Sequence, residues 1–240
     1  MTAAEIIAEI KPLGLESYRK VMRNHGVQEP LFGVKIEELK KIQKRIKKDY
    51  QLALDLFDTG IYDAMYLAGL IADDKKMTKA DLKRWIKQAV HRPIRGVTVA
   101  WVASESLHGM ELGLEWIESK DESIAATGWN TLSSLVSIKP DAELDLGKLK
   151  QLLEHIGKTL KKQPAGTRHA SIAYAMNGFV IAVGSYVAPL TDLAMEIGEK
   201  NGVITVDMGD TDCKVPFAPD YIRKVKARGS IGKKRKSAKC

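Results

Sequence analysis

Val97-Thr-Val-Ala-Trp-Val-Ala-Ser-Glu105, inside the apolar run 96–108, is one copy of a pattern that decides the fold. Similar segments begin at Ala64 (Ala-Met-Tyr-Leu-Ala), Ala126 (Ala-Thr-Gly-Trp-Asn) and Ala170 (Ala-Ser-Ile-Ala-Tyr), and the successive starts lie 33, 29 and 44 residues apart. Each is expected in the second helix of a helix pair, at spacings typical of helical-pair repeats. Such pairs stack and bury one face on the next pair. The pattern therefore favours an all-α helical-repeat solenoid, with an irregular helical bundle as the alternative.

Helical periodicity extends over most of the chain. In residues 34–48, apolar side chains recur at roughly helical spacing. Thr78 followed by Asp81 predicts a capping box at the start of another helix. Strand signals are nearly absent before Val203. The expected helices are 3–12, 16–25, 34–48, 52–58, 62–72, 78–89, 96–107, 112–118, 121–137, 146–160, 168–183, 189–200 and 221–228.

Composition indicates an ordinary soluble protein with a polyanionic partner. Hydrophobic residues make up 45% and charged residues 28% of the 240 residues, which is typical of a globular chain rather than a disordered one. The net charge of +8 favours nucleic acid or an acidic surface as the partner. The two cysteines, Cys213 and Cys240, form no CxxC pair and fit a reducing compartment. No signal peptide or membrane-spanning run is indicated, so a cytoplasmic protein is expected.

One face of the helix expected at 34–48 is almost entirely basic. A charge run is usually a solvated face, but solubility alone would be expected to mix the two signs. Phosphate groups bind such a face through Lys and Arg. The basic residues are Lys40, Lys41, Lys44, Arg45, Lys47 and Lys48.

Trp101 and Glu105 lie one helical turn apart and therefore share a face. An indole can press against a sugar or a base, and a carboxylate can stabilise a developing positive charge or hold a water molecule. The structural alternative places Trp101 in the core and Glu105 at its rim, paired with a lysine.

The sequence resembles the DNA alkylation repair family of HEAT-like-repeat DNA glycosylases over about residues 15–190. The resemblance is carried by Phe32-Gly-Val-Lys-Ile-Glu-Glu-Leu-Lys-Lys41, by the stretch from Leu54 to Asp73, and by the Trp101 helix. It implies a HEAT-like or armadillo-type solenoid with double-stranded DNA in a basic groove, and excision of cationic N3- or N7-alkylated purines. As the glycosidic bond breaks, the sugar becomes oxocarbenium-like, and a nearby carboxylate stabilises it.

By this resemblance the catalytic candidates are Trp101, Glu105 and Tyr174. Glu105 stands where the family has Asp, and Tyr174 stands where a second Trp is expected. The family's backbone-contacting Arg falls near Gly128-Trp129-Asn130, where this chain has none; Arg95 or Arg168 would have to replace it. Asn177 stands where some members have another Arg. These departures leave open a non-catalytic protein that binds damaged or branched DNA.

The last forty residues lie outside the family pattern. Residues 1–200 are expected to form the repeat domain and 201–231 an irregular capping extension. The acidic turn at 207–213 is expected to be a loop rather than a metal site. Residues 232–240 form a basic tail, expected to be an unpacked arm whose Lys233, Lys234, Arg235 and Lys236 contact phosphates; a nuclear address is the alternative.

Most ordinary enzyme motifs are absent. The chain has no HExxH, GxSxG or GxxxxGK[ST] sequence, and its five histidines show no metal-ligand spacing. We therefore expect a monomer without metal or cofactor. The residues expected to bind DNA are Lys40, Lys44, Arg45, Lys48, Arg95, Arg168, Lys233, Lys234, Arg235 and Lys236. A protein–protein scaffold remains the third function considered.

Overall fold

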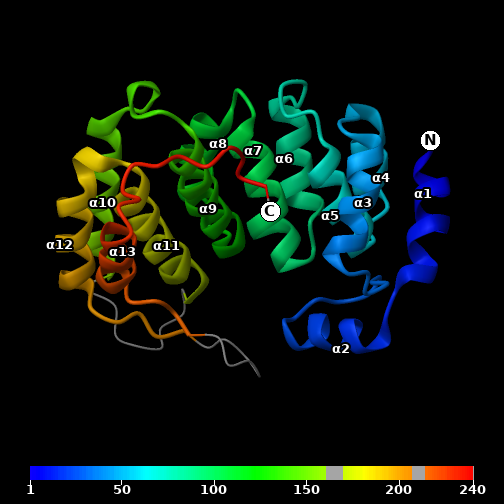
Figure 1. Ribbon diagram of the computed structural model, residues 1–240, viewed down its shortest axis with the longest axis horizontal. Helices are drawn as coiled ribbons and strands as arrows, with labels where there is room; N and C mark the ends of the chain where they lie inside the picture. The colour runs from blue at the N-terminus through cyan, green and yellow to red at the C-terminus, as the bar shows by residue number, and fades with distance from the viewer. Residues whose placement is uncertain (161–169, 207–213, 240) are drawn as a thin grey trace. The chain divides into compact units, whose positions relative to one another are not determined.

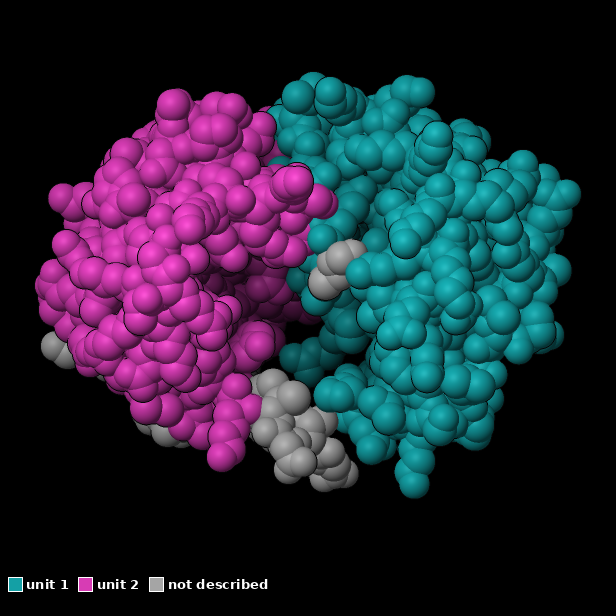
Figure 2. Space-filling model, viewed as in Figure 1, with its two compact units in different colours: residues 1–108, 209–211, 239 teal, residues 109–208, 212–238, 240 magenta. Residues whose placement is uncertain are grey.

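A computed structural model describes residues 1–160, 170–206 and 214–239. The described residues form helices and connecting loops, and their only β-type pairing is an isolated antiparallel bridge between Gly14 and Val34 (Figure 1). The all-α prediction is confirmed. Contacts divide the described chain into two compact units, which Figure 2 colours separately. Unit 1 contains residues 1–108 and Lys239, and unit 2 contains residues 109–160, 170–206 and 214–238.

The described part of unit 1 is built from seven α-helices, one 3-10 turn and one π-helical turn. Its elements are α1 (Ala3–Ile10), η1 (Lys11–Leu13), α2 (Glu16–Asn24), α3 (Ile36–Ile46), α4 (Tyr50–Asp58), α5 (Tyr62–Ile71), α6 (Lys79–Gln88), η2 (Ile94–Val99) and α7 (Ala100–Glu105).

The central helix of unit 1 is α5, in which every residue is buried. It packs against α3, α4 and η2, so that it needs apolar residues all round rather than along one stripe. Gly69 allows η2 to approach closely, because a Cβ at this position would meet Thr98 Cγ2 at 2.1 Å. Buried Asp63 accepts hydrogen bonds from the backbone N–H groups of Phe32 (2.6 Å) and Val34 (2.7 Å), which fixes the entry to α3.

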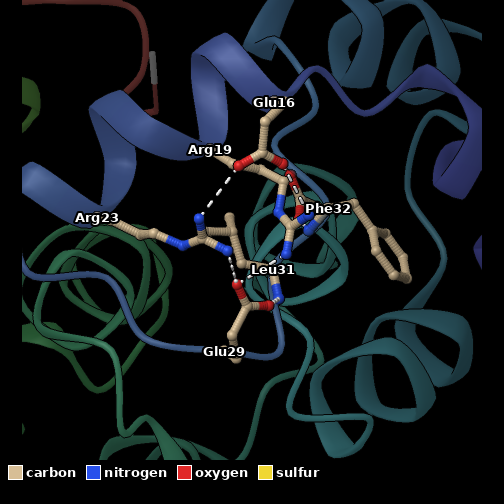
Figure 3. Close-up of polar contacts among 7 residues, drawn as sticks. Glu16, Arg19, Arg23, Glu29, Leu31 and Phe32 are labelled. Carbon is tan, nitrogen blue, oxygen red and sulfur yellow. Dashed lines mark hydrogen bonds and ion pairs between the residues drawn. The ribbon is translucent and has the colours of Figure 1, made fainter.

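An ion-pair network fixes the loop that follows α2. Arg19 and Arg23 project from this helix and both contact Glu16 and Glu29 (Figure 3). The two guanidinium groups lie 2.9 and 2.7 Å from Glu29, which also accepts a hydrogen bond from the N–H of Leu31 at 3.0 Å. Hydrogen bonds from Arg23 and Arg19 lower the pKa of Glu29 to about 2.

Unit 2 contains α8 (Gly109–Ile117), α9 (Glu122–Ile138), η3 (Asp141–Glu143), α10 (Leu146–Leu160), α11 (Ala170–Tyr186), η4 (Ala188–Leu190), α12 (Thr191–Asn201) and α13 (Ala218–Ala227). Helix α9 packs closely on both α8 and α11. Trp129 of α9 is 1% exposed and meets Phe179 of α11 edge-on, with ring centroids 5.3 Å apart.

The sequence-expected helix pairs are present. The four recurrent segments lie in α5, in η2 with α7, in α9 and in α11, and each follows the first helix of its pair. The capping box at α6 also forms, since Thr78 and Asp81 each accept from the other's backbone N–H. No single helix among the described residues meets the length and hydropathy of a membrane span; one pair bent by 119°, Ser171–Tyr186 with Ala188–Asn201, meets them only jointly.

The expectation of an unpacked C-terminal arm is wrong for residues 232–239. The backbone N–H groups of Gly232 and Arg235 donate to the carbonyls of Ser185 (2.9 Å) and Ser137 (2.8 Å), and Ala238 is 1% exposed. Those carbonyls lie in the last turns of α11 and α9, where helices leave acceptors without partners. The tail packs because its backbone donors satisfy helix ends, which its composition does not reveal.

Candidate nucleic-acid site

Trp101, a candidate site residue of unit 1, lies in the first turn of α7. Its side chain is 7% exposed, and Tyr66 of α5 meets it edge-on, with ring centroids 5.8 Å apart and planes at 81°. Both rings are largely enclosed by their own unit, so only a small part of the indole reaches the surface. The packing explains why the segment is apolar, and it holds the indole in one position.

Glu105 is the last residue of α7 and is half-buried. Its negative charge attracts the ammonium of Lys48, which belongs to the loop between α3 and α4. Partial burial of Lys48 opposes its charge, but the hydrogen bond to Asp74 and the negative charges of Asp74, Glu105 and Asp73 together raise the pKa of Lys48. The ammonium therefore stays protonated beside the Glu105 carboxylate at neutral pH.

Asp74 is the buried centre of this arrangement. Its carboxylate is 2% exposed and lies 2.9 Å from Nζ of Lys48 and 2.8 Å from Nζ of Lys239. Lys239 also donates to the carbonyl of Ala72, the C-cap residue of α5, at 3.2 Å. We call Lys48, Asp74 and Lys239 the Asp74 cluster; it carries two positive charges on one carboxylate.

Lys48 is predicted from the basic helix at 34–48, but its partners Asp74 and Lys239 are not. Asp74 and Lys239 are 165 residues apart in the chain, and no local pattern connects them. The one available signal was the Asp73-Asp74 pair directly after an apolar helix. Chemically, the site combines a half-buried carboxylate with an ammonium of the kind that binds phosphate.

The basic residues of α3 and of the turn that follows it differ in whether they have an acidic partner. Lys41 lies 2.7 Å from Glu38, and Arg45 lies 2.6 Å from Glu9. Lys40 and Lys44 lie one turn apart on α3. Lys47 is the C-cap residue that follows this helix, with φ 66°. None of the three has an acidic partner among the described residues. We call these three the lysine stripe. Lys44 and Lys47 are exposed, whereas Lys40 is half-buried.

The other predicted site residues are distributed over both units. Arg95 is half-buried in η2 of unit 1, whereas Tyr174 is 43% exposed on α11 of unit 2. Arg168 lies outside the described residues. Asn177 is 5% exposed and donates to the carbonyl of Pro216 at 2.9 Å. This asparagine therefore helps to pack the C-terminal residues against α11.

Three of the four predicted tail cations face solvent. Lys233, Arg235 and Lys236 are exposed. Lys234 instead lies 2.8 Å from Asp141 and donates to the carbonyl of Val136 at 2.9 Å. Its ammonium is used to hold the tail on α9.

No group of three or more metal-ligating side chains occurs within the described part of the chain. The acidic turn 207–213, considered above as a metal site, lies outside that part.

The helix pairs define the class of protein as a HEAT-like helical-repeat protein. A solved structure with this fold superposes with a TM-score of 0.89, covers 100% of both chains and is 33% identical. It is described as representing a new family of proteins related to the HEAT-like repeat DNA glycosylases with affinity for branched DNA structures.

The family model for the DNA alkylation repair enzyme matches residues 4–197, and the chain belongs to this family. Two uncharacterized proteins are similar over 234 residues, which is 95% of this chain and 99% of each relative: Lin0241 of Listeria innocua, 31% identical, and Lmo0209 of Listeria monocytogenes, 32% identical. The HEAT-like-repeat prediction and the family resemblance are thereby confirmed.

Proposed function

We propose that this protein binds DNA through its phosphate backbone and that branched DNA is its preferred form. The lysine stripe is the observation that carries the proposal. Lys40 and Lys44 on α3 and Lys47 directly after it have no acidic partners in the described chain. Together they concentrate positive charge, which binds phosphates by releasing counterions. A net charge of +8 acts in the same direction.

The preference for branched DNA is supported by the similar solved structure, whose family is described as having affinity for such DNA. Phosphate contacts place a protein on DNA without reading base sequence. We therefore expect sequence-independent binding in which the shape of the DNA decides affinity.

The test compares a four-way junction with a duplex of the same sequences in a mobility-shift titration. The proposal predicts tighter binding of the junction and little dependence on base sequence. Equal affinity for the two forms would remove the preference for branched DNA. Undetectable binding of both at low salt would refute DNA binding and favour the protein–protein scaffold.

A second candidate function is excision of alkylated purines at Trp101 and Glu105. The observation that favours it is the half-buried carboxylate one turn from a positioned indole. A carboxylate in this setting stabilises an oxocarbenium-like sugar. Release of 7-methylguanine from methylated DNA by the purified protein tests this function, and absence of release would leave binding alone.

A further inference from the structure

The positive charge of this chain is concentrated near its C-terminus. Residues 214–239 contain ten lysines and arginines and one acidic residue, so this segment has a net charge of +9. The whole chain has a net charge of +8, and the rest of the chain therefore has a net charge of −1. Charge of one sign at this density is typical of a surface that binds a polyanion. The segment contains α13 and the packed tail, which the lysine stripe does not include.

Helix α13 presents an aromatic ring and cations to solvent. The helix packs against α11 and α12, and its outer side is exposed (Figure 1). Tyr221, 47% exposed, and exposed Lys224 lie one turn apart on it. Exposed Arg228 is the C-cap residue, and its N–H donates to the carbonyl of Lys224 at 3.3 Å, so it continues the same side of the helix. We call Tyr221, Lys224 and Arg228 the α13 face.

The cations of the α13 face are not neutralised by carboxylates of the described residues. The one acidic residue of the segment, Asp220, lies 2.7 Å from Arg223, which also pairs with Glu199. Lys224 and Arg228 have no acidic partner in the part of the chain that the structure describes. Their charges can therefore act on a phosphate.

The tail continues this charge along a fixed path. Gly229, with φ 60°, closes the turn after α13, and its N–H donates to the carbonyl of Lys226 at 2.9 Å. The N–H of Gly232 then donates to the carbonyl of Ser185 in α11, also at 2.9 Å. Because the backbone is already ordered, the cations of the tail lose less conformational freedom on binding. The exposed cations that follow are Lys233, Arg235 and Lys236.

An exposed aromatic ring among cations favours single-stranded DNA over an acidic membrane. Bases of a single strand stack on aromatic side chains, while lysines and arginines hold the phosphates. A helix that lies in a membrane interface also needs an exposed apolar face. In α13, Ala218 and Ile222 are 1% and 0% exposed, because they belong to the core of unit 2. The helix therefore has no such face to insert into lipid.

We propose that the α13 face binds a single-stranded arm of branched DNA. Tyr221 stacks on one unpaired base, and Lys224 and Arg228 bind phosphates of the same strand. The inference rests on the proposed function, because it assumes that DNA is the ligand, and it deepens it by naming a second contact and the kind of strand that binds there. A closed duplex offers no unpaired base to Tyr221.

The probes are a DNA flap with a single-stranded arm, a single-stranded oligothymidylate and a closed duplex, each titrated by fluorescence anisotropy. Tyr221→Ala removes the ring, and Tyr221→Phe is the matched control that keeps it. Lys224→Ala/Arg228→Ala removes two cations. Its matched control, Lys150→Ala/Lys158→Ala, removes the same charge from exposed positions of α10. All these side chains are exposed, so the variants are expected to fold with the Tm of the parent.

Tyr221→Ala is expected to bind the oligothymidylate and the flap roughly five- to tenfold more weakly, the lower part of the range for one stacked base. Tyr221→Phe should bind them as the parent does, and neither change should alter affinity for the closed duplex. For Lys224→Ala/Arg228→Ala, the negative slope of log affinity against log salt on oligothymidylate should fall in magnitude by about 1.4, at roughly 0.7 per single-strand phosphate contact. Lys150→Ala/Lys158→Ala should leave this slope nearly unchanged.

Three results would overturn the inference, and they are distinguishable. If Tyr221→Ala and Lys224→Ala/Arg228→Ala bind the single-stranded probes as the parent does, the α13 face is not the contact, and the proposed function stands. If the parent binds no DNA at low salt, the proposed function fails together with the inference. Vesicles of phosphatidylserine and phosphatidylcholine test the membrane: if Lys224→Ala/Arg228→Ala weakens vesicle binding but not DNA binding, the α13 face contacts lipid instead.

Discussion

Lys239 provides the sharpest stability prediction, because it is near the end of the chain yet contacts a buried carboxylate. We consider Lys239→Met, which keeps most of the side-chain bulk and removes the charge. The change leaves Asp74, 2% exposed, with Lys48 as its cationic partner, and it removes the hydrogen bond to the carbonyl of Ala72.

The magnitude follows from the exposure of the partners. Breaking a fully buried ion pair by removing one partner costs about 3–5 kcal/mol. Here Lys48, 53% exposed, remains on Asp74 and offsets part of that loss. We therefore expect a loss of about 2 kcal/mol. For a chain of this size this corresponds to a fall in Tm of roughly 4–8 °C.

The assay is thermal and urea unfolding followed by circular dichroism. Lys236→Met is the matched control, because Lys236 is an exposed cation of the same tail. In a double-mutant cycle, Lys239→Met should lose most of its effect when Asp74 is already asparagine, because the two residues interact directly. Equal Tm values for Lys239→Met and Lys236→Met would refute the packed-tail account.

Three further predictions follow from individual contacts. The pKa of Glu29 is lowered to about 2, so its contribution to stability is complete above its ordinary pKa near 4.5 and is lost as pH falls through 2. The difference in unfolding free energy between the parent and Glu29→Gln, measured by urea unfolding, should therefore shrink between pH 5 and pH 2. Gly69→Ala should destabilise the protein by about 1–3 kcal/mol, because the new methyl group meets Thr98. Gly178→Ala, which has open space at its Cβ, should be neutral or stabilising, and equal urea midpoints for the two variants would contradict this. If the protein excises alkylated purines, Glu105→Gln should slow release of 7-methylguanine about a hundredfold with DNA affinity unchanged, and an unchanged rate would exclude Glu105 from the chemistry.

The sequence predicted the elements whose signals are local. The helix predicted at 34–48 and the capping box of α6 follow from side chains three to five residues apart. The structure has both, although the helix spans only Ile36–Ile46. The π-helical turn spans Ile94–Val99, of which residues 96–99 are predicted as ordinary helix, because one local turn of different hydrogen bonding leaves the apolar periodicity almost unchanged.

Contacts between distant residues could not be predicted. Nothing near Lys239 in the sequence indicates Asp74, and nothing near Arg45 indicates Glu9. A basic residue with an acidic partner and one without look alike in sequence. Which basic residues in and directly after α3 have acidic partners, and which belong to the lysine stripe, is therefore information that only the structure provides. Composition likewise predicted a free tail, although its backbone donors satisfy helix ends.

The central claim is that the lysine stripe binds DNA phosphates. The most direct test measures the salt dependence of junction affinity for Lys44→Ala/Lys47→Ala and for Lys41→Ala/Arg45→Ala. Each double variant removes two positive charges from or beside the same helix, but the second pair already has acidic partners.

Log affinity falls linearly with log salt, and each lost phosphate contact reduces the magnitude of this negative slope by roughly 1. We expect the magnitude of this slope to fall by about 2 for Lys44→Ala/Lys47→Ala. For Lys41→Ala/Arg45→Ala we expect it to stay nearly unchanged. Equal slopes for both variants, or junction affinity that does not depend on salt in the parent, would contradict the central claim.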